Sequence, residues 1–152
     1  MTTNFWRQAY KVIFSANQII ERIEDGQSER LDQLKGENLY LRAMAHFDLV
    51  KYFGRPYVQG QGNNPGIVIK DDNSDEALPS RSTVKEVYDF VIADLLKAAS
   101  LMTEEKPASF ASREVAYALL SRIYLYMEEN EKAIEYADLV INSGRYELLS
   151  TN

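Results

Sequence analysis

Three residues in one acidic stretch have the spacing of a cation-binding loop. Asp71, Asn73 and Asp75 match the first three ligand positions of a calcium loop. The pattern then fails, because Glu76 stands where such a loop needs a glycine for its sharp turn, and Ser82 stands where it needs a bidentate glutamate. We therefore expect a solvated acidic loop and no metal site.

The residue combinations of common enzymes are missing from the sequence. It contains a single histidine, His46, and no cysteine, so disulfides, thiolate metal sites and cysteine nucleophiles are excluded. Neither an HExxH motif nor a glycine-rich phosphate loop is present. The paired acids Glu104-Glu105 and Asp71-Asp72 are adjacent in sequence and fall in expected loops, where nothing holds two carboxylates at the separation that a glycosidase requires. We expect no enzyme activity, no catalytic residue and no bound cofactor.

Aromatic side chains are the remaining candidates for ligand contact. The sequence has ten tyrosines and one tryptophan, Trp6. Sugar sites favour such aromatic faces, but tyrosines at helical spacing more often pack in a core, and Trp6 stands on an apolar helix stripe. The residues alone therefore assign no glycan-binding position.

Composition limits the class of protein and its partners. The 152 residues suffice for one domain, with 45% hydrophobic and 26% charged residues. The formal net charge is −6 and Lys and Arg are interleaved with acids, which argues against nucleic acid as a partner. No apolar run approaches the roughly 18 residues of a membrane span. The first residues lack the features of a signal peptide, so we expect either a cytosolic protein or a natural start elsewhere.

Apolar periodicity predicts an all-α fold. The expected helices cover about residues 4–24, 32–53, 83–102, 112–128 and 130–143, and one long loop covers 54–80. The second of these is apolar over most of its circumference, which predicts burial between other helices. Arg42, His46 and Asp48 interrupt its apolar run and should have hydrogen-bond partners, with Asp48 or Glu37 expected to pair with Arg42. Gly54 is expected to end this helix as a C-cap with positive φ.

Local sequence also predicts where helices begin and how they pair. Thr83 and Glu86 form a capping box, whereas Ser28 is a weak one, and Ser112 and Asn130 are expected to cap the last two helices. Asn17, on the apolar face of the first helix, is expected to make an interhelical hydrogen bond. The last two helices should form a hairpin of tetratricopeptide type, and the second and third a looser pair. In the hairpin of the last two helices, the facing residues are expected to be Tyr117, Leu120, Ser121 and Tyr124 on the first helix and Ala133, Ala137 and Val140 on the second.

Several stretches together resemble the SusD/RagB family of outer-membrane nutrient-binding lipoproteins from Bacteroidetes. The matching residues are Ala16 to Glu21, Gly36-Glu37, Leu41-Arg42-Ala43, Phe47, Leu49-Val50, Phe53-Gly54, Arg55-Pro56-Tyr57, Gly66-Ile67-Val68, Pro79, Arg81, Val84, Glu86-Val87-Tyr88, Asp94-Leu95, Arg113, Ala116, Ala118 to Tyr126, Val140-Ile141 and Gly144-Arg145-Tyr146. Two positions depart from the family pattern: Val68, where proline is common, and Glu114, where lysine is usual.

The resemblance implies that residues 1–152 are a single scaffold domain and a fragment of a longer protein. Such proteins carry a lipid anchor, which we expect to lie outside residues 1–152, and they lie on the surface of the outer membrane. Their helical scaffold supports oligosaccharide-binding loops and docks against a SusC-like TonB-dependent transporter. The alternative that the residues leave open is a stand-alone tetratricopeptide-type module that holds a peptide, although no regular repeat at a fixed period is present.

Overall fold

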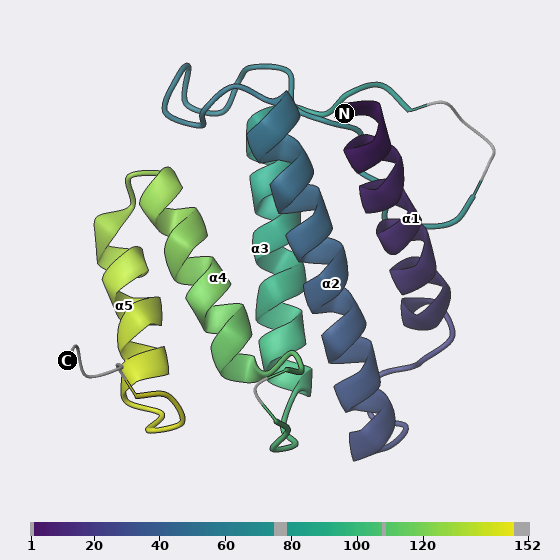
Figure 1. Cartoon of the computed structure of the whole chain (residues 1–152), viewed down its shortest axis with the longest axis vertical. Helices are drawn as coiled ribbons and strands as arrows, with labels where there is room; N and C mark the ends of the chain where they lie inside the picture. Colours follow the sequence, from purple (N-terminus) through teal and green to yellow (C-terminus); the bar gives the residue numbers. More distant parts are fainter. Residues whose placement is uncertain (1, 75–78, 108, 148–152) are drawn as a thin grey trace.

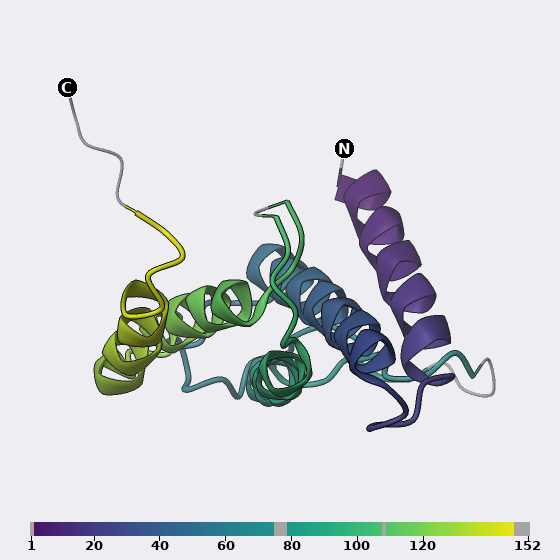
Figure 2. The same cartoon turned by 90° about the horizontal axis from the view of Figure 1, so that it is seen from below.

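Over the residues that it describes, the computed structural model contains five helices that lie side by side in the order of the sequence, each antiparallel to the one before (Figure 1). The structure describes residues 2–74, 79–107 and 109–147. The helices are α1 (Thr2–Ile20), α2 (Glu29–Phe53), α3 (Val84–Leu101), α4 (Arg113–Tyr126) and α5 (Asn130–Ile141). Seen end-on, the row is curved rather than flat, with α3 on its convex side (Figure 2). The all-α prediction is confirmed, and over the described ranges the β-structure is limited to one isolated bridge between Pro65 and Thr83.

The core is centred on α2 and α3, whose contact is the most extensive between any two helices. The prediction that the second and third helices form a looser pair than the last two is therefore wrong. Both helices carry the predicted apolar residues inward, because each is covered on both sides by neighbours. The fully or almost fully buried side chains of these two helices include Leu39, Ala43, Phe47, Leu49, Val50, Val84, Val87, Val91, Leu95 and Ala98.

The absence of a side chain at Gly36 allows α2 and α3 to approach closely. A Cβ atom there would lie 2.7 Å from Cγ of Met102, 3.1 Å from the carbonyl oxygen of Ala98 and 3.2 Å from Cβ of Leu101. We expect Gly36→Ala to lower the free energy of unfolding by about 1 kcal/mol, because an overpacking cost of about 2 kcal/mol, the middle of the usual range, outweighs the roughly 1 kcal/mol gained in helix propensity. Urea unfolding would measure the change, and a variant as stable as the parent would contradict it.

Helix termini largely follow the sequence, with two corrections. Thr83 and Ser112 cap α3 and α4 through their side-chain oxygens, as predicted. Ser28, for which only a weak cap was expected, caps α2 in the same way, so α2 begins at Glu29 rather than near residue 32. Asn130 was expected to cap α5 but is its first helical residue. The N-cap is Glu129, because the tight turn after α4 already bonds the Glu129 N–H back to the Tyr124 carbonyl.

The second correction concerns the end of α2. Gly54 does not adopt positive φ: its φ is −95° and its ψ 171°, which is extended backbone. Glycine is required there for space instead, because a Cβ atom would lie 2.7 Å from the carbonyl oxygen of Val50.

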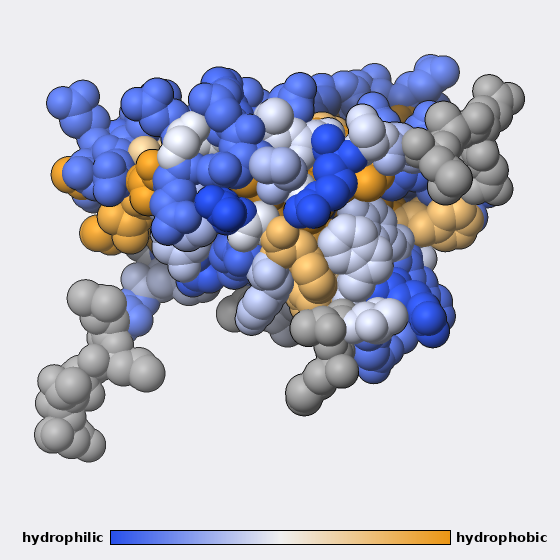
Figure 3. Space-filling view, turned by 90° about the horizontal axis from the view of Figure 1, so that it is seen from above, coloured by the Kyte–Doolittle hydropathy of each residue, from blue (hydrophilic) through white to orange (hydrophobic). Residues whose placement is uncertain are grey.

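The α4–α5 hairpin has the predicted inner face. Ser121 donates a hydrogen bond from Oγ to the Ala133 carbonyl at 2.7 Å, and the rings of Tyr124 and Tyr136 stack with centroids 5.4 Å apart. Its outer surface carries apolar residues among charged ones: Leu125 and Ile134 are more than half exposed, and Glu135 and Asp138 are also exposed. In Figure 3, hydrophobic residues lie among hydrophilic ones on the side of the molecule where this hairpin lies, and others lie over the middle and the opposite side.

None of the helices, within the part of the chain that the structure describes, has the length and apolar character needed to span a membrane.

Candidate functional site

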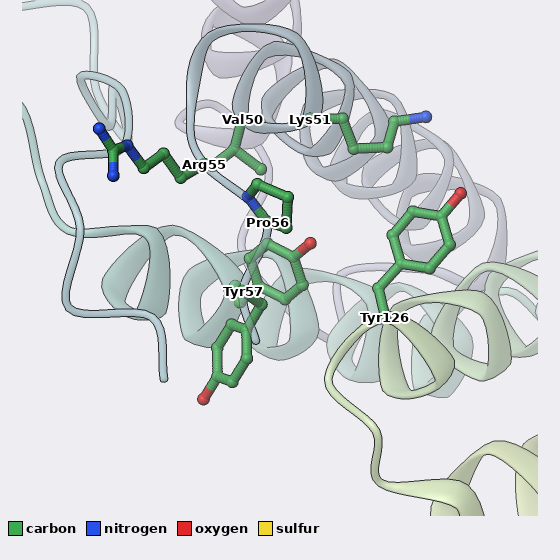
Figure 4. Close-up of a pocket in the computed structure, with 7 residues that line it drawn as sticks. Val50, Lys51, Arg55, Pro56, Tyr57 and Tyr126 are labelled. Atoms are coloured by element: carbon green, nitrogen blue, oxygen red, sulfur yellow. The ribbon is translucent and has the colours of Figure 1, made fainter. Parts of the chain in front are cut away.

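An open cleft of about 420 Å³ lies where the end of α2, the loop that follows it, the start of α3 and the end of α4 meet (Figure 4). This volume is within the range of roughly 300–1,000 Å³ that is typical of small-molecule sites. We call it the tyrosine cleft. Its lining consists of Val50, Lys51, Arg55, Pro56, Tyr57, Tyr88 and Tyr126.

Three tyrosines from three separate segments give the cleft its character. The ring centroids of Tyr57 and Tyr88 are 5.0 Å apart, and Tyr126 lies 5.8 Å from Phe47, which in turn packs edge-on against Tyr88. Tyr126 is 44% exposed and Tyr57 is half-buried, whereas Tyr88 is only 4% exposed. The cleft therefore has two accessible aromatic rings at its sides and a buried one beneath them.

The hydroxyl of Tyr88 is the unusual polar group of this cleft. No hydrogen-bond partner for it is found among the described residues, although the ring is almost fully buried. Within the described ranges, the side-chain atoms that are both fully enclosed and without a hydrogen-bond partner belong to Asn73. The Tyr88 hydroxyl is not among them, so it is open to solvent. Burial, with the neighbouring Tyr126 and Tyr57, raises the pKa of Tyr88 to about 12. The group therefore remains a protonated donor that opens into the cleft.

The loop after α2 is held against α3 by backbone hydrogen bonds. The N–H of Gly62 bonds the carbonyl of Tyr57 at 2.8 Å, and the carbonyl of Gly62 accepts from the N–H of Lys85 at 2.9 Å. First-turn amides of a helix need such outside acceptors. Gly62 has a φ of +79°, and a Cβ atom on it would lie 2.8 Å from Cβ of Lys85 and 2.9 Å from Cε2 of Tyr57. This tight contact sets the ring of Tyr57 beside Tyr88.

Two cationic side chains stand at the edges of the cleft. The amino group of Lys51 is 2.8 Å from a carboxylate oxygen of Asp48 and 5.0 Å from the centroid of Phe47. Arg55 directs its guanidinium away from Tyr126 (Figure 4). The lining residues include no carboxylate and no imidazole, which are the usual general acids and bases. The arrangement suits binding by contact rather than acid–base chemistry.

The second polar feature is a buried centre around Arg42. Its guanidinium forms a bidentate pair with Asp94, with Nε–Oδ2 2.7 Å and Nη2–Oδ1 2.8 Å. Nη1 also donates to Oδ1 of Asn17 and to the carbonyl of Asp71, both at 2.9 Å. Burial raises the pKa of Asp94, and the guanidinium opposes that rise. This centre ties α1, α2, α3 and the long loop together, and the interhelical bond predicted for Asn17 is confirmed.

The expectation that Arg42 pairs with Asp48 or Glu37 is wrong. Asp48 pairs with Lys51 at the surface, and Glu37 accepts from Gln33 and pairs with Lys106. Both of these acids are close to Arg42 in sequence, whereas its true partner, Asp94, lies 52 residues away on α3. Only helix packing brings Asp94 to Arg42.

His46 is an interior histidine with both ring nitrogens bonded, as predicted. Nδ1 donates to the Arg42 carbonyl at 2.9 Å, so Nε2 is the acceptor for the N–H of Lys70 at 3.2 Å. Burial lowers the pKa of His46 to about 4. Protonation would remove the acceptor and place a charge beside Arg42.

This geometry predicts a loss of stability in acid. The unfolded chain would take up a proton on His46 near pH 6.5, whereas the folded chain would do so only near pH 4. The free energy of unfolding should therefore be highest above pH 6.5 and should fall by about 3 kcal/mol as the pH drops to 4. Because His46 is the only histidine in the sequence, an NMR titration of its imidazole isolates this effect from the carboxylates. A measured pKa near 6.5 in the folded protein would contradict the prediction.

Among the described residues, the other acidic candidates from the sequence are not gathered into one site. The carbonyl of Asp71 accepts a hydrogen bond from Arg42, and the carboxylate of Asp72 accepts from the N–H and the Oγ of Ser74. Asp75 and Glu76 lie outside the described residues. Over the described ranges, no three histidine or acidic side chains are placed to hold a metal ion. Glu104 and Glu105 are exposed in a loop.

Trp6 packs against the core, with its ring edge-on to Phe53 at 4.7 Å, as its place on the apolar stripe predicted. The tyrosine cleft, by contrast, was missed. Its aromatic residues are 31 and 38 positions apart in the sequence, so no local motif connects them.

Comparison with known proteins decides the family. The family profile described as starch-binding associating with outer membrane, SusD-like, matches residues 1–125. The chain belongs to the SusD-like family. This SusD-like chain is 30% identical to SusD-like protein P2 of Formosa agariphila, over 97% of the chain and 29% of that protein. It is 29% identical to SusD-like protein P38 of the same organism, over 94% of the chain and 27% of that protein.

Solved structures agree with this assignment. A SusD superfamily protein from Bacteroides thetaiotaomicron superposes with a TM-score of 0.89 and 37% identity, over 95% of the SusD-like chain and 33% of that protein. A SusD-like carbohydrate binding protein from Bacteroides vulgatus superposes with a TM-score of 0.84 and 27% identity, over 96% of the chain and 32% of that protein. The SusD-like chain therefore spans about a third of the length of its relatives.

Proposed function

We propose that this chain is the helical scaffold of a SusD-like protein that captures oligosaccharides at the surface of the outer membrane. The intact protein would be lipid-anchored there and would deliver its ligand to a SusC-like TonB-dependent transporter. The observation that carries the proposal is the match of residues 1–125 to a family described as starch-binding and associated with the outer membrane.

Two features of the structure support a scaffold role. The buried Arg42 centre joins three helices and the long loop, which gives the row of helices a rigid middle. The exposed apolar residues of the α4–α5 hairpin, Leu125, Ile134 and Ile141, are the kind of residues on which a neighbouring helical unit packs in repeat architectures. The contacts proposed for capture are stacking and hydrogen bonding, without a covalent step.

The test uses the full-length protein in which this chain occurs. Isothermal titration calorimetry with a panel of neutral oligosaccharides, including maltoheptaose and laminarihexaose, should show saturable binding to at least one of them. Purification from outer membranes should recover the protein together with its transporter. A protein that binds none of these sugars, and that purifies without a transporter, would refute the proposal.

A further inference from the structure

We propose that the tyrosine cleft binds one neutral pyranose residue of an oligosaccharide, so that the helical scaffold itself carries a carbohydrate subsite. This inference rests on the proposed function for the class of ligand. It goes beyond that function because it assigns contact residues within the helical scaffold.

The shape and surface of the cleft fit a sugar ring. A pyranose has an apolar C–H face and a rim of hydroxyls, and aromatic rings present a negative face that attracts such C–H groups. Tyr57 and Tyr126 supply accessible rings from two different elements, on either side of a cleft of about 420 Å³. Tyrosine suits this role because its ring is apolar and its hydroxyl remains polar.

The hydroxyl of Tyr88 is available to a polar ligand. A hydroxyl that bonds no protein group and opens into a cleft is hydrogen-bonded to water in the free protein, and a ligand hydroxyl can replace that water. The Tyr88 ring is 4% exposed, yet its hydroxyl bonds no described residue and opens into the cleft. A sugar hydroxyl placed over the cleft would accept this hydrogen bond.

Charge at the cleft favours a neutral ligand over an anion. Lys51 is neutralised by Asp48 at 2.8 Å, and the nearby Lys85 is paired with Asp89 at 2.5 Å. Arg55 points its guanidinium away from Tyr126 (Figure 4). A phosphate or polyanion would require several free cations converging on one point, and these lining residues do not provide them.

The decisive variants remove single ligand contacts and leave the fold intact. Tyr88→Phe deletes only the unpartnered hydroxyl, so the free energy of unfolding should stay unchanged while the affinity for the sugar falls about fivefold. Tyr126→Ala removes an accessible ring and should weaken binding at least tenfold. Tyr52→Ala is the matched control: Tyr52 is near the same end of α2 and is 72% exposed, but it packs on Phe5 of α1 rather than in the cleft.

The measurement is calorimetric titration of the full-length protein and each variant with the sugar that the parent binds among maltoheptaose and laminarihexaose. Weaker binding by Tyr88→Phe and Tyr126→Ala, with Tyr52→Ala unchanged, supports the cleft. If the parent binds and both cleft variants bind equally well, the subsite is refuted and the proposed function stands. If the folded parent binds neither sugar, the proposed ligand class and the subsite fail together.

Discussion

Arg42→Ala should lower the free energy of unfolding by about 3–5 kcal/mol, measured by urea or thermal unfolding. The substitution leaves the carboxylate of Asp94 buried without its bidentate partner, and the side chains of both residues are only 8% exposed. Breaking a buried ion pair by removing one member is costly because the remaining charge is uncompensated. The same change removes the donor to Asn17 and to the carbonyl of Asp71, so the long loop loses an anchor to α2.

Two further variants separate charge from geometry. Arg42→Lys keeps the charge but cannot form the planar bidentate contact, so it should remain clearly less stable than the parent. The double variant Arg42→Met, Asp94→Leu leaves neither charge buried and should be more stable than Arg42→Ala. An Arg42→Ala protein with the stability of the parent would show that the Asp94 pair does not hold the helices together.

Leu120→Ala should lower the free energy of unfolding by about 2–5 kcal/mol, as a large-to-small substitution in the core. Leu120 is fully buried on the face of α4 that packs into the core, so truncation leaves a cavity that the helices can close only in part. Chemical unfolding of the parent and the variant measures the difference.

Leu125→Ala provides the matched control on the same helix. Leu125 is 57% exposed on the outer face of the hairpin, so its truncation should change stability by no more than about 0.5 kcal/mol. A larger loss from Leu125→Ala than from Leu120→Ala would mean that the inner and outer faces of α4 have been exchanged, and equal losses would mean that the two positions do not differ in burial.

The helices and their buried faces could be predicted because the information is local. The apolar residues of α3 that recur at helical spacing, among them Val84, Val87, Val91 and Leu95, are buried. Thr83 and Glu86 form the predicted capping box because both partners lie within one turn. Even the hairpin face with Ser121 and Ala133 could be predicted, since the short turn after α4 leaves one way to pair the two helices.

The resemblance in sequence to the SusD family was confirmed by the match of residues 1–125. Its main block, from Gly36 to Gly54, coincides with the central helix, where Gly36 allows close packing. These positions are constrained by the space between helices, which explains why a family pattern can be recognised from them.

What the sequence determined by itself was the number of helices, their inward faces and the family, because each depends on neighbours within a few turns. The tertiary structure alone decided which distant groups meet. Arg42 pairs with Asp94 rather than with Asp48 or Glu37, and Tyr57, Tyr88 and Tyr126 converge on one cleft, because the packing angle of the helices places them there. Contacts between residues that are dozens of positions apart carry no periodicity, so only the folded arrangement reveals the buried ion pair and the candidate binding surface.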